Sequence, residues 1–103
     1  MSDKSVILIN LLKVKPENQT ALLALLKQNT ESVIRTLQGW KSTRLIGSED
    51  GAGVVIYSEW ESAEAIAAMR NDPRMKAYFP KIGALASLES LVGSSVFDET
   101  RSG

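Results

Sequence analysis

The fold is decided by the stretch Trp40-Lys-Ser-Thr-Arg-Leu-Ile-Gly47, Ser48-Glu-Asp-Gly-Ala-Gly53, Val54-Val-Ile-Tyr-Ser-Glu-Trp60. Its two outer runs carry branched and aromatic side chains, which pack well on the surface of a β-sheet. The middle run holds two glycines, and glycine takes the positive φ values of tight turns at little steric cost. The sequence therefore predicts a β-hairpin with strands at residues 40–47 and 54–60 and a turn at 48–53.

The chain before the hairpin predicts a strand followed by a long helix. Residues 6–14 are rich in Val, Ile and Leu and end just before Pro16, which is typical of a buried strand. Pro16 suits the first position of a helix, where its missing N–H is not needed. Leucines then recur at helical spacing, so we expect a helix over residues 16–37 that ends beside Gly39.

The chain after the hairpin predicts two helices and a last strand. Ser62 is a good N-cap for a short helix that ends at about Arg70. Asp72-Pro73 is typical of the start of another helix, which we expect to run to Leu85 with a kink or break at Pro80. Residues 87–97 are expected to form the fourth strand and residues 98–103 a frayed tail.

The order β-α-β-β-α-α-β predicts a ferredoxin-like α+β fold, with a four-stranded antiparallel sheet and helices on one face. The whole chain, 1–103, fits one domain with its core at about 6–97. The strands are apolar on both faces, whereas the helices can cover only one of them. We therefore expect a second copy to cover the other face in a two-fold homodimer. That face is expected to comprise Ile7, Ile9, Leu11, Leu45, Val55, Tyr57, Leu91 and Phe97.

The composition excludes several classes of function. Lys plus Arg and Asp plus Glu both number 12, and a neutral chain lacks the basic surface that binds nucleic acids. The chain has no cysteine and no histidine, which excludes thiolate and Ser-His catalysis, His- or Cys-bound metals and a proximal-His haem. The apolar run in residues 6–12 is too short for a signal peptide or a membrane span, so we expect a cytoplasmic protein that does not bind membranes.

The stretch Val54-Val-Ile-Tyr-Ser-Glu-Trp-Glu-Ser-Ala-Glu-Ala-Ile66 resembles the strand-to-helix signature of the antibiotic biosynthesis monooxygenase (ABM) family. Gln38-Gly39-Trp40 is similar to that family's Pro-Gly-Phe turn, and Asn71-Asp72-Pro73 with the helix after it is similar to the family as well. The resemblance covers about residues 6–97. It implies a dimeric α/β barrel of two ferredoxin-like sheets, and oxidation of a bound aromatic molecule with O₂, usually without a separate cofactor.

Two branches of this family require different residues. The haem-degrading branch has an Asn, a Trp and a His at the positions of Asn10, Met69 and Phe79. Only the Asn is kept here, so we expect no haem degradation. The branch that oxidises anthrones has a Trp at the position of Trp60 and an Asn at that of Ile56, and this chain keeps only the Trp.

Three residues are candidates for catalysis. The amide of Asn10 interrupts an apolar strand and can donate to a substrate oxygen, although a buried structural amide is the alternative. Trp60 offers an indole face and an N–H donor, or else anchors the core. The phenol of Tyr78 is a donor or proton relay, or else a structural side chain. The candidate substrate-binding residues are Asn29, Ile56, Met69, Arg74 and Phe79.

We therefore expect a cofactor-independent monooxygenase that acts on an aromatic or quinone-forming small molecule, with no metal and no cofactor. The alternative is a non-catalytic dimer of the same fold that binds an apolar small molecule. Both require an open cavity, and we expect Asn10, Trp60 and Tyr78 to converge on it between the sheet and the second and third predicted helices.

Overall fold

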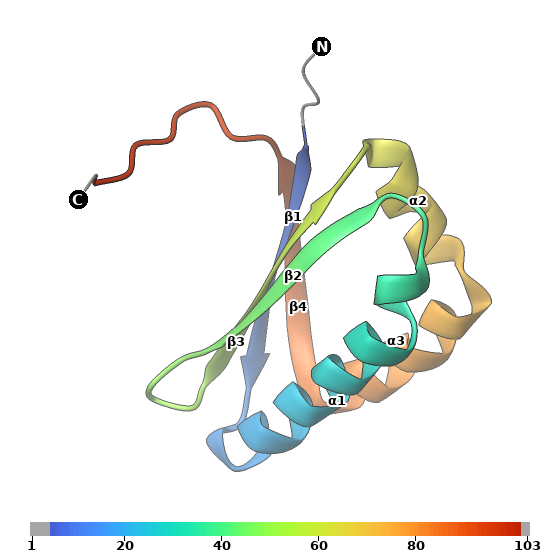
Figure 1. Cartoon of the computed structure of the whole chain (residues 1–103). Helices are drawn as coiled ribbons and strands as arrows, with labels where there is room; N and C mark the ends of the chain where they lie inside the picture. Colours follow the sequence, from blue (N-terminus) through green and yellow to red (C-terminus); the bar gives the residue numbers. More distant parts are fainter. Residues whose placement is uncertain (1–4, 102–103) are drawn as a thin grey trace.

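The computed structural model describes residues 5–101 of the 103-residue chain, so positions 102 and 103 of the expected tail lie outside the described residues. Three helices cover one face of a single sheet (Figure 1). The strands are β1 (Val6–Val14), β2 (Trp40–Gly47), β3 (Gly53–Trp60) and β4 (Ala86–Gly93). The helices are α1 (Gln19–Ser32), α2 (Ala63–Asn71) and α3 (Pro73–Leu85), with 3-10 turns at Pro16–Asn18 and Ile34–Thr36.

The sheet confirms the predicted ferredoxin-like α+β fold. Its strand order is β2-β3-β1-β4, and every neighbouring pair is antiparallel. β1 is therefore a central strand, and its register places Asn10 beside Ile56 of β3 and Ser90 of β4. Since side chains opposite each other in a ladder share a face, these three residues point to the same side of the sheet.

The long helix expected over residues 16–37 is wrong at both ends. Helical geometry begins at Pro16, because the residue before a proline is held in an extended conformation, but the first turn, Pro16–Asn18, is a 3-10 turn and the α-helix starts at Gln19. The α-helix ends at Ser32, where Val33 leaves helical geometry with φ −124° and ψ −58° and a second 3-10 turn follows. Both 3-10 turns retain the helical direction, which explains why the apolar spacing looks continuous in the sequence.

A kink or break was expected at Pro80; the helix is not broken there, and α3 continues from Pro73 to Leu85. Pro80 is exposed, as is Lys76 four residues earlier, so water can bond the carbonyl that the missing N–H leaves free. None of the helices within residues 5–101 is long and apolar enough to cross a membrane.

The fourth strand is shorter than predicted. It ends at Gly93, and residues 94–101 continue without a helix or strand along a path that leaves the sheet (Figure 1). Phe97 is 77% exposed in this segment and is not part of a sheet face, contrary to expectation.

The side of the sheet away from the helices is apolar at its centre and charged at its edges. Ile7, Ile9 and Leu11 of β1 alternate with the helix-facing residues, and Leu91 beside them on β4 is 64% exposed. Leu45 was expected on this side, but it pairs with Ile56 and faces the helices, because a bulge between Trp40 and Ser42 shifts the register of β2. Its place is taken by Ile46, which is 48% exposed.

The core lies between the sheet and the helices in two separate clusters. One is centred on Trp60 and Leu8, and the other on Leu12 and Leu22. Met69 of α2 belongs to the first cluster and Leu22 of α1 to the second, whereas α3 contributes Met75 to the first and Ile82 to the second.

Candidate active site

A cavity of about 400 Å³ lies between the two core clusters. It is bounded by the sheet on one side and by α1, α2 and α3 on the other, and its walls are mostly apolar. Its volume falls within the range of about 300–1,000 Å³ that is usual for small-molecule sites. Seven polar or charged side chains interrupt the apolar lining: Asn10, Asn29, Thr30, Thr43, Ser58, Arg70 and Ser90.

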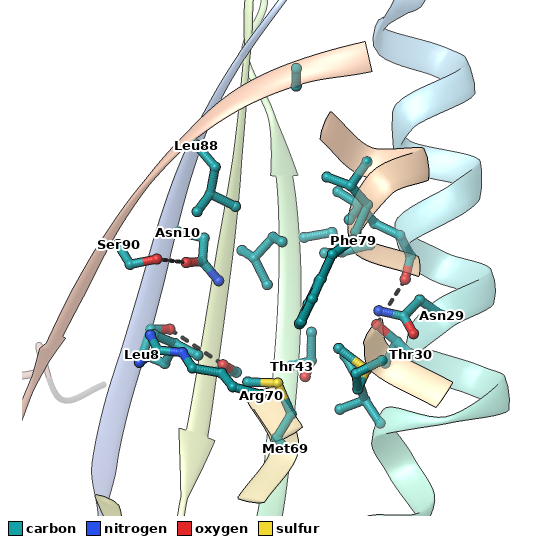
Figure 2. A pocket seen from close by; sticks show the side chains of 18 of the residues that line it. Leu8, Asn10, Asn29, Thr30, Thr43, Met69, Arg70, Phe79, Leu88 and Ser90 are labelled. Carbon is teal, nitrogen blue, oxygen red and sulfur yellow. Dashed lines mark hydrogen bonds between the residues drawn. The ribbon is translucent and has the colours of Figure 1, made fainter. Parts of the chain in front are cut away.

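Asn10 points its amide into this cavity from the centre of the sheet. The Ser90 hydroxyl on β4 donates a hydrogen bond to the Asn10 Oδ1 atom. This bond fixes the orientation of the amide, and Figure 2 shows the amide nitrogen directed into the cavity. Since Asn10 is only partly buried among apolar neighbours, its N–H group is a donor available to a bound molecule.

Trp60 lies in the same cavity wall but uses its polar atom internally. The indole Nε1 donates to the Ser58 Oγ at 3.0 Å, and Ser58 in turn donates to the Leu8 carbonyl at 3.3 Å. Trp60 is 1% exposed and Ser58 is 4% exposed, so this chain of bonds is dry and rigid. Trp60 therefore contributes only a small part of its ring to the cavity wall, and its N–H is already paired.

Asn29 enters the cavity from α1, across from Asn10 (Figure 2). It is 3% exposed, and its Oδ1 has no hydrogen-bond partner among residues 5–101. A buried unpaired amide oxygen costs about 1–3 kcal/mol, so natural proteins rarely keep one without a use. The unpaired oxygen is enclosed by the protein, whereas Figure 2 shows the Asn29 amide nitrogen on the side of the cavity.

Several other predicted residues line the cavity too. Ile56 lies beside Asn10 on β3, Met69 comes from α2 and Phe79 from α3. Phe79 is 40% exposed, and Leu88 on β4 is 50% exposed, so these two side chains mark the opening.

Tyr78 and Arg74 do not join the cavity, contrary to expectation. Within the described part of the chain, neither belongs to the lining. Tyr78 faces the adjacent side of α3, where it packs against both core clusters and lies 5.4 Å below the Lys81 ammonium group. Arg74 turns back to Asp72, with Nε 3.2 Å from Oδ1. Its hydrogen bond lowers the pKa of Asp72, and the carboxylate raises the pKa of Arg74.

Arg70, rather than Arg74, is the arginine at the cavity, and sequence reasoning missed it. It occupies the last turn of α2, directly after the lining residue Met69. The helix was predicted to end at about Arg70, so the sequence did not predict the direction in which this side chain points. Ser58, Thr43 and Ser90 were also missed, although Ser58 and Ser90 follow from strand parity once the register is known.

Comparison of the sequence with known protein families identifies related proteins. The model of the antibiotic biosynthesis monooxygenase family matches residues 5–81. A tetracenomycin-F1 monooxygenase from Streptomyces glaucescens is 40% identical over 72 residues, which are 70% of this chain and 64% of that protein. The match therefore spans less than two thirds of the relative's own length.

Solved structures share the fold at lower identity. A monooxygenase from Streptomyces coelicolor in complex with the ligand nanaomycin D superposes with a TM-score of 0.87 at 23% identity, over 97% of this chain and 95% of that one. A cofactor-independent oxygenase from Streptomyces nogalater gives a TM-score of 0.72 at 17% identity, over 96% of each chain. With three quarters of its length matched by the family model, this chain belongs to the antibiotic biosynthesis monooxygenase family.

Proposed function

We propose that this protein is a cofactor-independent monooxygenase that oxidises a flat aromatic or quinone-forming molecule with O₂. The observation that carries the proposal is the cavity itself, which has apolar walls and an amide donor fixed in direction by Ser90. Membership of the family and the 40% identical tetracenomycin-F1 monooxygenase support it.

The proposed chemistry needs little from the protein beyond binding and charge stabilisation. A phenol or an acidic C–H group of the substrate loses a proton, and the electron-rich anion reduces O₂ directly. The carbon of the anion forms a bond to O₂, and the O–O bond of the resulting hydroperoxide then breaks as the second hydrogen on that carbon leaves. One oxygen atom stays as the new carbonyl group, and the other departs as water with the hydrogens that the substrate has lost. The Asn10 Nδ2 group donates to the oxygen that carries the developing negative charge, and the apolar walls strengthen that bond by excluding water.

Asn29 and Trp60 position the substrate in this proposal. The amide nitrogen of Asn29, which lies on the cavity side, donates a hydrogen bond to a substrate oxygen. Trp60 supplies a small aromatic part of the wall that its bond to Ser58 holds in place. Ile56, Met69 and Phe79 complete the apolar contact surface.

This chain has Ile56 where the anthrone-oxidising pattern has an Asn. The difference is compatible with this chemistry, because Ile56 and Asn10 lie directly opposite each other in the sheet. The amide therefore stands one strand away from the position that the anthrone-oxidising pattern predicts, on the same face. A donor displaced by about 5 Å selects a different substrate oxygen.

We also propose that the protein works as a homodimer through the uncovered face of the sheet. Ile7, Ile9, Leu11, Ile46, Val55, Tyr57 and Leu91 form the apolar centre of this face. Association would bury the apolar area that these side chains still expose, which is largest at Leu11, Ile46 and Leu91, and each Å² so buried contributes about 25 cal/mol before the entropic cost of association. Charged residues at the margin, such as Lys13 and Glu89, resemble the polar rim of a stable interface.

The second candidate is a non-catalytic protein that binds an aromatic small molecule. It is favoured by one observation: within residues 5–101, the cavity lining contains no carboxylate, imidazole or phenol that would act as a base. The first proposal then requires a substrate acidic enough to ionise without a protein base.

Oxygen uptake separates the two candidates. The protein is mixed with a panel of anthrones and hydroquinones in metal-free buffer, and O₂ consumption is compared with protein-free controls. We expect turnover with at least one fused-ring member of the panel. Reversible binding without any O₂ uptake across the panel would favour the non-catalytic protein.

A further inference from the structure

The cavity lining carries an unbalanced charge. Of the residues that line it, all within the described part of the chain, Arg70 alone is charged. The whole protein is neutral, with 12 basic and 12 acidic side chains, yet this apolar chamber is faced by a single cation. A positive charge beside low-dielectric walls attracts anions more strongly than the same charge in open water.

The position of Arg70 is not explained by a partner in the protein. Arg74, four residues later, is paired with Asp72, whereas no carboxylate among residues 5–101 lies within 4.0 Å of the Arg70 guanidinium. The negative end of the α2 dipole stabilises a cation in the last helical turn whichever way its side chain points, so it does not explain why Arg70 faces the cavity. Figure 2 shows the side chain extended towards β1, on the side of the cavity where Asn10 presents its amide nitrogen.

The geometry also fixes where along the cavity this charge acts. Arg70 is an exposed residue, as are Phe79, Leu88 and Ser90, and these four surround the opening, whereas Asn29 lies at the buried end. A ligand that reaches Asn29 with one edge therefore brings its opposite edge to Arg70. The guanidinium has several N–H donors in a planar fork that matches a carboxylate.

We infer that Arg70 makes this cavity selective for a fused aromatic ring system that carries an anionic group, of the carboxylate kind, on the edge that faces the opening. This inference rests on the proposed function for the aromatic part of the ligand and adds the charge. Arg70 binds and orients the ligand in this scheme, and it takes no part in the oxidation.

Two probes of matched shape test the inference without any reaction. Anthraquinone-2-carboxylate is anionic, and anthraquinone-2-carboxamide is neutral and nearly the same size. Dissociation constants are measured by quenching of tryptophan fluorescence, since Trp60 lines the cavity. We expect the wild-type protein to prefer the carboxylate by about tenfold, as a charge-assisted bond at a partly exposed site provides.

Variants identify the residue responsible. Arg70→Gln should reduce the preference to about one by weakening the carboxylate alone, and Arg70→Lys should retain part of it. Arg74→Gln is the matched control, because it removes an arginine from the same surface outside the lining, and the preference should survive. Raising the salt concentration to 1 M should lower the wild-type preference and leave carboxamide binding unchanged.

The outcomes are distinct from those of the oxygenase test. Equal binding of the two probes, no binding of either, or a preference that disappears in Arg74→Gln instead of Arg70→Gln would overturn the inference. The expected binding pattern together with no O₂ uptake by anthrones would support the anionic subsite while refuting the proposed reaction.

Discussion

Replacing Asn10 by Leu should abolish most of the activity while leaving the fold intact. The two side chains have similar size, and Leu suits a strand whose neighbours on this face are Leu8, Leu12 and Ile56. The substitution removes one hydrogen-bond donor from the cavity and the acceptor that Ser90 uses. Because Ser90 is exposed, water can replace that acceptor.

The size of the effect follows from the number of donors involved. A single directed N–H group that stabilises a developing oxyanion contributes about 10²–10³-fold to kcat, or about 2.7–4 kcal/mol. The loss of the Ser90 bond costs only about 0.5–1.5 kcal/mol of stability and is offset by burial of the Leu side chain. We therefore expect kcat to fall about 10²–10³-fold with a change in unfolding free energy of about 1 kcal/mol or less.

The assay is steady-state O₂ consumption with the best anthrone of the panel, beside urea unfolding of both proteins. Ser90→Ala is the matched control: it keeps the Asn10 donor but releases its orientation, so a smaller loss of about threefold to tenfold is expected. A kcat for Asn10→Leu within threefold of the wild type, in a folded protein, would refute the role of the amide.

Three further substitutions test the fold and the assembly. Ile9→Asp places a charge at the centre of the uncovered sheet face and should convert a dimer to a monomer or unfold it, whereas a wild-type protein that sediments as a monomer at micromolar concentration would contradict the interface. Gly39→Ala should destabilise the protein by about 1–3 kcal/mol in chemical unfolding, because φ is +89° and the new Cβ would lie 2.5 Å from that of Ala65. Asp72→Ala removes the N-cap of α3, whose Oδ1 accepts from the Arg74 N–H at 2.8 Å, and should lower Tm. Since the folded-state pKa of Asp72 is lowered by its hydrogen bond to Arg74, this stabilisation is present above the unfolded pKa and disappears as the pH falls through the folded value. The difference in Tm between wild type and variant should therefore shrink as the pH is lowered below 3.8, and a constant difference would contradict the cap.

The strands were the most predictable part of the molecule. Alternation of side chains placed Asn10 and Trp60 on one face from the sequence alone, and the register of β1 with β3 has this arrangement. The same rule failed for Leu45, because a β-bulge near the start of β2 reverses parity and leaves no signal in the hydrophobic pattern. Phe97 was misassigned since a strand-like composition continues beyond the last paired residue at Gly93.

Helix-borne residues were harder to assign. Tyr78 and Phe79 are neighbours in sequence, yet Phe79 faces the cavity and Tyr78 packs against the two core clusters. A turn of about 100° per residue separates them, and the sequence does not fix the rotation of a helix on its sheet to that accuracy. Arg70 and Arg74 lie on consecutive helices for which the same uncertainty applies, so only the structure distinguishes the cavity arginine from the paired one.

The central claim is that this cavity supports direct reaction of an aromatic substrate with O₂, and isotope labelling tests it most directly. Turnover of an anthrone is carried out under ¹⁸O₂ in ordinary water, with rapid quenching and mass spectrometry of the product. We expect one ¹⁸O atom in the new carbonyl group of the product. The wild-type protein should form this product faster than protein-free buffer does, and Asn10→Leu should form it at least about a hundredfold more slowly than the wild type. Product formed no faster than in protein-free buffer, or product whose new oxygen comes from water, would contradict this claim.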